Sequence, residues 1–531
     1  MKKNYLLLFY FSSFIAFAQA PTIQWQKTLG GSSIDILKSV YERNGNFYLS
    51  GFSNSNVSGD KTLVNGATNT NDIWALSLHS SGTLLWQNSY LHSNPNDLLQ
   101  DNIASLHYFD NAFFFGVTYD DFDVWMTRAH KFNESGIYQG LIFPGKDDVC
   151  SGINYSSSYD VTATDYFKTS DGNYFFSGTN GNLFQTCGGF NNYFISKSSS
   201  TSYNSTLWSK EFSANNYEEL KSTIETNDGG FLLSGTSNST ISGDKTENSN
   251  GGNDFWVIKT NSLGTIVWQN TIGGNLSDEP VSAIQTNDGG YLIAGSSNSS
   301  LSGDKTENSK GGFDYWIVKL DSNGNVLWDK TIGGNLDDKI AKIIPTSDGN
   351  YVLIGSSKST ISGNKTESNR GEFDIWMLKI NSSGSILWDK TIGGNLDDNA
   401  YDVIQTSDNG YFIGATSTST ISGDKTENNR GNKDYWALKL EPDNLSIPEN
   451  NSLSTILLYP NPTDGIITID FGAFQETVSI STLNVLGQLI SKHNFSQISE
   501  KQLQIDEPSG VYFLEIENGN QDKKVFKIVK N

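Results

Sequence analysis

Several kinds of residue are scarce in this chain, and each shortage excludes a class of protein. Its 531 residues include 3 Met and 36% hydrophobic side chains against 51 Gly, which disfavours long helices and favours strands and turns. Lys and Arg number 36 against 58 Asp and Glu, so the formal net charge is −22. Because nucleic-acid binding needs basic groups to neutralise phosphates, DNA and RNA are not expected partners. The five histidines do not recur at ligand spacing, which argues against a His-based metal centre.

Long hydrophobic runs are also missing, apart from one at the N-terminus. There, Lys2-Lys3 precede an apolar stretch from Tyr5 to about Phe17, and Ala18-Gln19-Ala20 follow it. A basic start, a short apolar segment and small residues at its end are typical of a secretory signal peptide. About 13 apolar residues are too few to span a bilayer, which needs about 20, so no transmembrane anchor is predicted. Residues 1–20 are therefore expected to direct export.

Only two cysteines are present, Cys150 and Cys187. In an exported chain, two cysteines are expected to form a disulfide rather than a redox or metal site. The predicted Cys150–Cys187 bridge would stabilise the fold by a few kcal/mol.

The spacing of the tryptophans reveals a repeat. Trp256, Trp316, Trp376 and Trp436 are 60 residues apart, and an earlier series from Trp208 to Trp388 has the same spacing. In the unit that starts at Trp268, four strands are predicted at 281–286, 291–297, 314–321 and 326–332, separated by Gly-containing turns and one long polar loop. Large residues occupy both phases of the third strand, so both of its faces should be covered. Four-stranded units of this kind are typical of the blades of a β-propeller.

Seven third-strand signatures can be counted, beginning at Asp72, Asp123, Asn192, Asp254, Asp314, Asp374 and Asp434. The last copy lacks a following strand, whereas an orphan strand, Ile23–Leu29, stands directly after the signal peptide. We therefore predict an all-β fold in which residues 21–441 form a seven-bladed β-propeller. The N-terminal strand is expected to close the ring as the outermost strand of the last blade.

The repeat stops near residue 441. Residues 442–455 are polar and contain Pro, which indicates a linker. Residues 456–531 follow a new strand pattern, which predicts a small C-terminal β-sandwich.

Several ordered motifs mark this C-terminal segment: a Tyr-Pro-Asn-Pro-Thr-Asp-Gly run, an Asn-Val-Leu-Gly-Gln turn, a Gly-Val-Tyr strand start and a lysine-rich last strand. Their marker residues are Tyr459, Pro460, Asn461, Pro462, Gly465, Gly487, Gly510, Tyr512, Lys523, Lys524 and Lys527. The segment resembles the type A C-terminal sorting domain of the type IX (Por) secretion system of Bacteroidetes, and the repeats resemble propeller repeats of secreted proteins that bear it. The resemblance implies outer-membrane translocation by the type IX machinery and its sortase, followed by surface attachment or release.

Repeated carboxylates are the candidates for a binding face. The long loops carry Asp60, Asp244, Asp304 and Asp424, with Asn364 in one copy, and the turns between blades end at Asp278, Asp338 and Asp398. Because strands alternate in direction, both sets of loops should emerge at one end of the blades. Carboxylate oxygens are ligands for Ca²⁺, so a Ca²⁺ site is one alternative for these loops. However, a Lys follows each Ser-Gly-Asp and would repel a cation, so turn capping and internal Asp–Lys pairs are favoured and no cofactor is predicted.

The sequence predicts a binding scaffold rather than an enzyme. It contains no GxSxG elbow, Walker loop or HExxH motif, and near-identical blades repeat the same residues, whereas an active site needs unlike residues at one point. We expect a secreted or cell-surface propeller that binds a glycan or protein ligand. The alternative is a secreted propeller enzyme, such as a glycoside hydrolase or lyase, with its site on the long-loop face. Its candidate residues in the divergent first three blades are Asp120, Asp121, Asp123, His107, His130 and Tyr155–Tyr159.

Overall fold

The computed structural model describes residues 17–64, 71–90, 99–120, 125–142, 160–181, 191–200, 205–446, 456–485, 487–519 and 523–531. Within these ranges every regular element is a β-strand. The chain divides into two compact units, residues 20–443 in one and residues 1–19 with 444–531 in the other.

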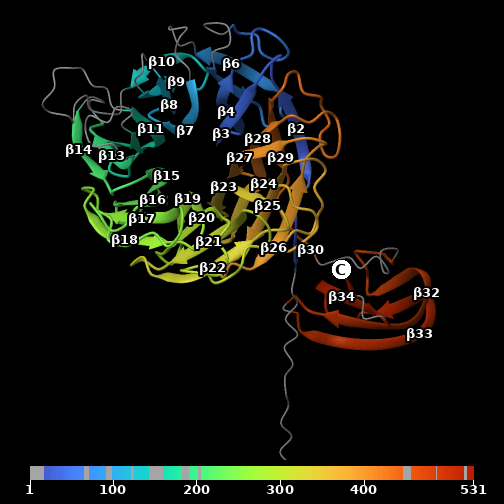
Figure 1. Ribbon diagram of the computed structural model, residues 1–531. Helices are drawn as coiled ribbons and strands as arrows, with labels where there is room; N and C mark the ends of the chain where they lie inside the picture. The colour runs from blue at the N-terminus through green and yellow to red at the C-terminus, as the bar shows by residue number, and fades with distance from the viewer. Residues whose placement is uncertain are drawn as a thin grey trace, which may run out of the picture. The chain divides into compact units, whose positions relative to one another are not determined.

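Residues 20–443 form seven four-stranded antiparallel sheets, which surround a central axis as the blades of a propeller (Figure 1). Blade 1 contains β3 (Asp35–Arg43), β4 (Asn46–Ser53), β5 (Asp72–Leu78) and β6 (Leu84–Tyr90), and blade 2 contains β7 (Leu99–Phe109), β8 (Ala112–Asp120), β9 (Trp125–Phe132) and β10 (Tyr138–Ile142). Blade 3 contains β11 (Asp160–Lys168), β12 (Tyr174–Gly181), β13 (Asn192–Ser198) and β14 (Thr206–Phe212), and blade 4 contains β15 (Glu218–Glu225), β16 (Phe231–Ser237), β17 (Asp254–Thr260) and β18 (Ile266–Ile272). Blade 5 contains β19 (Asp278–Gln285), β20 (Tyr291–Ser297), β21 (Asp314–Leu320) and β22 (Val326–Ile332), and blade 6 contains β23 (Asp338–Pro345), β24 (Tyr351–Ser357), β25 (Asp374–Ile380) and β26 (Ile386–Ile392). Blade 7 contains β27 (Asp398–Gln405), β28 (Tyr411–Ser417), β29 (Asp434–Leu440) and β2 (Ile23–Leu29).

The N-terminal strand closes the ring. β2 pairs antiparallel with β29 and is the outermost strand of blade 7. Trp436 Nε1 donates to Gln26 Oε1 at 3.0 Å, and Lys425 Nζ donates to Thr28 Oγ1 at 2.7 Å. The seven-bladed fold and its predicted closure are therefore confirmed.

The third strand of each regular blade is buried on both faces. All seven residues of β21 are buried, which explains why large residues occupy both phases of its sequence. Tyr315 Oη donates to Trp376 O of the next blade at 3.0 Å, and the two rings lie 5.0 Å apart. The same contact joins blade 7 to blade 1, where Tyr435 Oη donates to Trp74 O at 3.0 Å. A tyrosine at this position thus joins blades 3, 5 and 7 to the blade that follows each of them.

The outermost strands carry a second blade-to-blade contact. Trp268 of β18 donates through Nε1 to Ser322 O of blade 5 at 3.0 Å. Gly324 of that hairpin has φ +87°, and a Cβ built on it would lie 2.6 Å from the Trp268 ring. Glycine is therefore required both for the turn and for the approach of the tryptophan. The same pairing recurs for Trp25 with Gly82, Trp86 with Gly136, Trp208 with Gly264 and Trp328 with Gly384.

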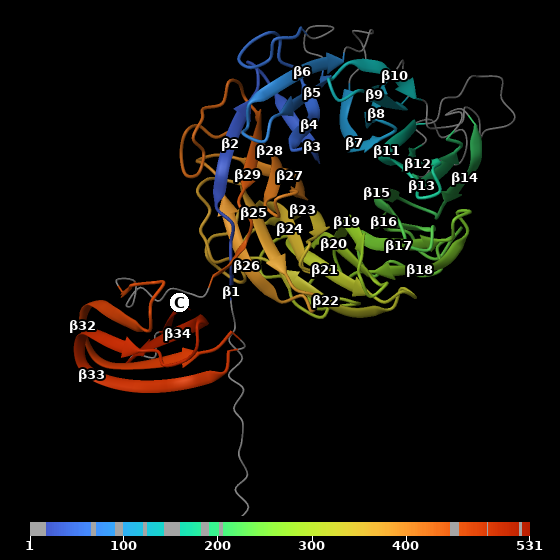
Figure 2. The same cartoon turned by 180° about the vertical axis from the view of Figure 1, so that it is seen from behind.

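The C-terminal unit is built on one five-stranded antiparallel sheet (Figure 2). Its strands are β31 (Leu457–Tyr459), β32 (Ile466–Leu483), β33 (Leu489–Gln504), β34 (Gly510–Asn518) and β35 (Lys523–Lys530). The long β32 changes register between Asp470 and Gln475, next to Gly472 with φ +65°. Ile469 and Phe471 before this change share one hydrophobic core with Ile480 after it. The sheet is thus continuous and bends around its core, which gives the packing of a small sandwich.

The same unit contains a short pair of strands, one from before the propeller and one from directly after it. β1 (Phe17–Gln19) pairs antiparallel with β30 (Asn444–Ser446). Cleavage after residue 20, as predicted for a signal peptide, would remove β1 and leave β30 without this partner.

Candidate functional site

The long loops and the turns between blades meet at one end of the propeller, here called the long-loop face. In blade 5, Asp304 N of the long loop donates to Gly273 O at 3.0 Å, and Asn275 N of the turn donates to Ser302 Oγ at 2.9 Å. The tight hairpins lie at the opposite end, because neighbouring strands are antiparallel. The long-loop face therefore carries the larger surface for a ligand.

The loop carboxylates bond to the blade before them. Asp304 Oδ2 accepts hydrogen bonds from Gly273 N and from Asn250 Nδ2, both at 3.1 Å. Corresponding bonds are donated to Asp60 by Gly30 N (3.3 Å), to Asp244 by Ser213 N (2.9 Å), to Asn364 by Gly333 N (3.2 Å) and to Asp424 by Gly393 N (3.0 Å). These half-buried side chains hold the loops in place, and the amide of Asn364 does so without a charge.

The carboxylates that follow the turns do not reach the surface. Asp278, Asp338 and Asp398 are fully buried. Asp398 Oδ2 accepts hydrogen bonds from Gly394 N at 2.6 Å and from Ser419 Oγ at 2.9 Å, so it ties the turn to the start of the long loop. The expectation that these three acids belong to an exposed binding face is corrected, because their oxygens are used inside the scaffold.

The lysine of each Ser-Gly-Asp-Lys motif also points inward. Lys305 Nζ donates to Thr331 Oγ1 at 2.8 Å and lies 5.1 Å from the centre of the Trp316 ring. Burial lowers the pKa of Lys305 to about 8. In the part of the chain that the structure describes, no three His, Cys, Asp or Glu side chains are grouped to hold a metal ion.

The long-loop face exposes aliphatic side chains instead. The residue before each Ser-Gly of the long loops is between 54% and 63% exposed, namely Val57, Ile241, Leu301, Ile361 and Ile421. Leu276, Leu336 and Leu396 of the turns are between 43% and 47% exposed. Blades 4, 5, 6, 7 and 1 are neighbours in the ring, so these side chains follow one arc of the face. A hydrophobic residue at a fixed place in an otherwise polar loop is the sequence signal that would have revealed them.

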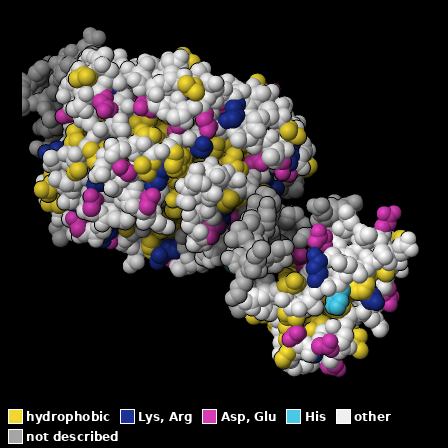
Figure 3. Space-filling model, turned by 90° about the horizontal axis from the view of Figure 1, so that it is seen from below, with side chains coloured by type: hydrophobic (Ala, Val, Ile, Leu, Met, Phe, Trp, Pro, Cys, Tyr) yellow, Lys and Arg dark blue, Asp and Glu magenta, His cyan; other side chains and the backbone are white. Residues whose placement is uncertain are grey.

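No single sign of charge dominates the side of the molecule that Figure 3 presents. Acidic, basic and hydrophobic side chains are interspersed on its propeller unit. Ion pairs also join the long loops of neighbouring blades: Arg370 Nε lies 3.1 Å from Asp424 Oδ2, and Arg430 Nε lies 2.9 Å from Asp60 Oδ2. These pairs lower the charge that the loop carboxylates present to a ligand.

Unlike residues meet close to the axis, on the innermost strands. Asp402 of β27 accepts hydrogen bonds through Oδ2 from Val40 N at 2.8 Å and Ser39 Oγ at 3.0 Å, and its Oδ1 pairs with Lys342 Nζ of β23. Burial, together with the charge of Lys342, lowers the pKa of His107 on β7 to about 4. Blades 6, 7, 1 and 2 thus contribute to one polar cluster, which near-identical repeats did not predict.

Of the other residues considered for catalysis, the structure describes the side chains of only the two histidines. His107 lies on the innermost strand of blade 2, whereas His130 lies on its third strand, 6.0 Å from the Tyr138 ring. Asp121, Asp123 and Tyr155–Tyr159 lie outside the described residues, as do Cys150 and Cys187, and the side chain of Asp120 is not described. The disulfide therefore stays a prediction.

The sorting-motif residues of the C-terminal unit form turns and strand starts. Asn461 Nδ2 donates to Lys527 O at 2.7 Å and its Oδ1 accepts from Val529 N at 2.9 Å, which joins the Pro-Asn-Pro segment to β35. Gly487 has φ +75° and closes a turn in which Gly487 N donates to Asn484 O at 2.9 Å. Tyr512 Oη donates to Pro508 O at 2.7 Å. Of the remaining marker residues, Tyr459 and Pro460 precede Asn461, Pro462 and Gly465 follow it, Gly510 starts β34, and Lys523 and Lys524 start β35.

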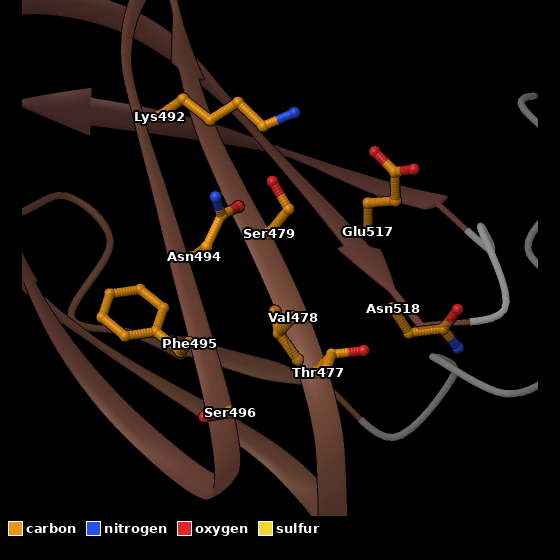
Figure 4. A pocket seen from close by; sticks show the side chains of 9 residues that line it. All are labelled: Thr477, Val478, Ser479, Lys492, Asn494, Phe495, Ser496, Glu517 and Asn518. Carbon is orange, nitrogen blue, oxygen red and sulfur yellow. The ribbon is translucent and has the colours of Figure 1, made fainter.

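A polar groove of about 440 Å³ lies on this unit, across β33, β32 and β34 (Figure 4). Ser479 is paired with Asn494 on one neighbouring strand and with Glu517 on the other, so these three side chains form a row across the sheet. Lys492, Thr477, Ser496 and Asn518 complete the polar part of its lining. The groove offers hydrogen-bonding groups of both kinds and both signs of charge.

Comparisons with known proteins assign the C-terminal unit. The family described as secretion system C-terminal sorting domain matches residues 457–531. No curated protein sequence matches the chain. In the parts of the chain that are described, there is also no helix with the length and hydropathy needed to cross a bilayer.

Solved structures with similarity to the chain include a puromycin hydrolase, with 10% identity, a TM-score of 0.43 and coverage of 86% of this chain and 61% of that one. The chain therefore spans less than two thirds of the hydrolase. YCF48 bound to D1 peptide has 10% identity, a TM-score of 0.38 and coverage of 81% and 100%. The GH43 endo-arabinanase from Bacillus licheniformis has 10% identity, a TM-score of 0.29 and coverage of 56% and 100%. Similarity this remote says nothing about activity, and the fold assignment rests on the strand order. Residues 457–531 are a secretion system C-terminal sorting domain of the type IX (Por) kind, and the chain joins this domain to a seven-bladed β-propeller.

Proposed function

We propose that the protein is a secreted or surface-displayed binding scaffold, which holds a glycan or protein ligand on its long-loop face. One observation carries this proposal. The repeated carboxylates are bonded within the scaffold, while the loops expose one aliphatic side chain per blade along an arc of five neighbouring blades. Equal groups repeated at equal spacing suit a ligand that is large or repetitive, because several weak contacts then act together.

The route of the protein follows from its C-terminal unit. A sorting domain of this family indicates secretion and contact with the secretion machinery. We infer further that residues 1–20 act as the signal peptide for the first membrane and that the machinery's sortase acts on the C-terminal domain. The basic start and short apolar segment of residues 1–20 support the first inference.

An enzyme is the second candidate. The observation in its favour is the axial cluster, because Asp402, Lys342, Ser39 and His107 come from four different blades. Against it, both oxygens of Asp402 already accept hydrogen bonds from the scaffold. The cluster is therefore better suited to holding the blades together than to catalysis.

The testing experiment is a screen of the full chain against immobilised polysaccharides and extracellular matrix proteins, with binding and turnover measured on the same samples. The scaffold proposal expects saturable binding with unchanged ligand. Immobilised DNA and RNA are added to the screen as a control and should not bind, because the chain has a net charge of −22. Turnover of a glycan that is lost on changing Asp402 of the axial cluster, or a single carboxylate of blades 1 to 3, would contradict the scaffold and support the enzyme.

A further inference from the structure

Each of blades 4 to 7 buries two carboxyl groups and one lysine at its long-loop end. In blade 6 the carboxyls belong to Asp338 and Asp374, which both pair with Ser357 of the strand between them. Lys365 comes from the long loop of the same blade, and none of the three residues is more than 2% exposed. The corresponding sets are Glu218, Asp254 and Lys245 in blade 4, Asp278, Asp314 and Lys305 in blade 5, and Asp398, Asp434 and Lys425 in blade 7.

These clusters hold each long loop at three points. Asp338 Oδ2 accepts from Ser359 Oγ at 2.9 Å, near the start of the loop. Lys365 Nζ, from the middle of the loop, donates to Thr391 Oγ1 at 2.5 Å. Asp374 Oδ2 accepts from Arg370 N at 2.5 Å, near the end of the loop. The order of the long-loop face therefore depends on the state of these groups.

The second oxygen of the third-strand aspartate has no partner. Oδ1 of Asp374 is buried without a hydrogen bond, and the same holds for Oδ1 of Asp254, Asp314 and Asp434. Gly393 lies directly against it, since a Cβ built on Gly393 would be 2.1 Å from Asp374 Oδ1. The backbone of Gly393 thus closes one side of this oxygen. An ionised carboxylate with an unpartnered buried oxygen is costly, whereas a protonated one is much less so.

The charges around the cluster lead to the same conclusion. With both acids ionised and the lysine charged, a blade would bury a net charge of −1. Burial and the charge of Asp398 of the next blade together raise the pKa of Asp374 to about 6, against the hydrogen bond from Arg370 N and the charges of Arg370 and Lys365 in the loop. Burial also lowers the pKa of Lys365 to about 8, although Asp338, Asp374, Asp389 and Glu367 all favour its charged form.

The other three blades follow blade 6. Burial raises the pKa of Asp314 and Asp434 to about 6 and that of Asp254 to about 7. Each of them also faces the first acid of the next blade, which is Asp338, Asp35 and Asp278 respectively.

We propose that the third-strand aspartate in each of blades 4 to 7 is protonated. In acidic solution these four protons stabilise the ordered long loops, and loss of the protons as the pH rises allows the loops to open. An acid whose pKa is higher in the folded than in the unfolded chain stabilises the fold while it is protonated. This contribution is complete below the unfolded-state pKa of 3.8 and is lost as the pH rises through about 6. The inference concerns the loops themselves and does not depend on the identity of a ligand.

Hydrogen–deuterium exchange of the full chain tests the proposal. After correction for the intrinsic rate, opening of residues 358–373 and 418–433 should increase between about pH 5 and about pH 8.5. The folded-state pKa of about 6 lies about one unit above pH 5, so the expected increase over this interval is about tenfold per aspartate. In the double variant Asp374→Asn with Asp434→Asn, whose amides imitate neutral acids, this dependence should disappear for both loops.

The control is Asp244→Asn, which removes a carboxylate from a long loop at the position where blade 6 already has Asn364. It should retain the wild-type pH dependence. Infrared spectra of the unaltered protein supply a second measurement that does not rely on variants folding. Exposed carboxyls titrate near pH 4, so a protonated carboxyl band that persists above about pH 5 and vanishes by about pH 8.5 reports the buried acids. Loop protection that is independent of pH, a double variant with the wild-type dependence, or the absence of this band would each overturn the proposal.

Discussion

Two turn glycines with similar backbone conformation differ in what surrounds them. The difference shows which glycine only forms a turn and which also makes room for a neighbouring blade. Gly289 has φ +80° and open space around it, whereas Gly324 has φ +87° and the Trp268 ring against it. Both provide a turn, and only Gly324 also seats the neighbouring blade.

We therefore expect Gly324→Ala to destabilise the propeller more than Gly289→Ala. A left-handed backbone costs a residue other than glycine about 1–2 kcal/mol, and displacing a packed ring adds about 1–3 kcal/mol. Chemical denaturation of both variants measures the difference in the free energy of unfolding. Equal losses would show that Trp268 does not depend on this glycine.

Asp443 is a second residue whose role appears only in the structure. Its carboxylate accepts hydrogen bonds from Tyr411 Oη at 2.8 Å and Trp388 Nε1 at 3.3 Å, and it pairs with Lys379. We expect Asp443→Ala to lower the free energy of unfolding by about 1–3 kcal/mol, because these buried donors lose their acceptor. A thermal melt that matches the unaltered protein would refute this role.

Burial of the repeated acids marks the limit of sequence reasoning at this scale. The positions of Asp278, Asp338 and Asp398 were evident from the repeat, but a carboxylate after a turn is normally solvated. The sequence feature that predicts their burial is the set of donors around them. The second Gly of the Gly-Gly turn and the serine two residues after the next strand both donate to the acid. Such pairs, distant in sequence, cannot be assigned before the blade is folded.

At the scale of single elements, the strands follow the sequence closely. In blade 5 the predicted 291–297 and 326–332 coincide with β20 and β22, and 314–321 exceeds β21 by one residue. The first strand begins at Asp278 rather than at 281. A bulge between Pro280 and Ser282 breaks the alternation there, and alternation was the basis of the prediction.

The closing strand β2 allows a sharp test of one element. Deletion of residues 21–31 removes the partner of β29 and the acceptors of Trp436 Nε1 and Lys425 Nζ. We expect a lower melting temperature and an exposed edge on blade 7. Adding a synthetic peptide of residues 21–31 should restore the melting temperature, whereas a peptide of the same composition in scrambled order should not. An unchanged melting temperature after the deletion would contradict closure.

At the scale of the whole molecule, the two ends of the propeller limit folding stability at opposite ends of the pH scale. At the hairpin end, hydrogen bonds from Lys319 and Thr286 outweigh partial burial and lower the pKa of Asp288 to about 2, and Asp228 behaves in the same way with Thr226 and Lys259. This stability is present above about pH 4 and is lost as the pH falls towards 2. At the long-loop end, stability is lost as the pH rises through about 6.

The melting temperature of the full chain should therefore be highest near about pH 4 and fall as the pH rises to about 6. Scanning calorimetry across this range measures it. A maximum above about pH 8 would contradict the assignment of protonated acids in the long-loop clusters.

Export is the second property of the whole molecule that can be tested. A chain truncated at Asn450 lacks the sorting domain at residues 457–531 but retains the propeller unit, residues 20–443. We expect it to fold and to accumulate in the periplasm of its native host, while the full chain reaches the surface. Cell fractionation followed by surface protease treatment distinguishes the two. Surface delivery of the truncated chain would contradict the role of the domain.

The fold and the sorting domain were accessible from the sequence because a repeat and a set of ordered motifs each leave a local pattern. The proposed binding face was accessible only in part. The end of the propeller at which the loops emerge followed from the alternating direction of the strands. Exposure of Leu301 or Ile361 and burial of Asp338, however, depend on how neighbouring blades pack. The residues that repeat in the sequence are those that hold each blade together, so the repeat does not reveal which ligand is bound.

The most direct test of the binding face compares two sets of exposed aliphatic residues. Leu301→Ser, Ile361→Ser and Ile421→Ser together alter the long-loop face, and Leu263→Ser, Val267→Ser and Leu327→Ser alter residues of similar exposure towards the hairpin end. The affinity of each triple variant for the ligand found in the screen is measured by calorimetric titration. The long-loop variant is expected to bind at least about tenfold more weakly than the unaltered chain, which corresponds to about 1.4 kcal/mol, while the hairpin-end variant binds as before. Retained affinity in the long-loop variant, with loss in the hairpin-end variant, would contradict the account.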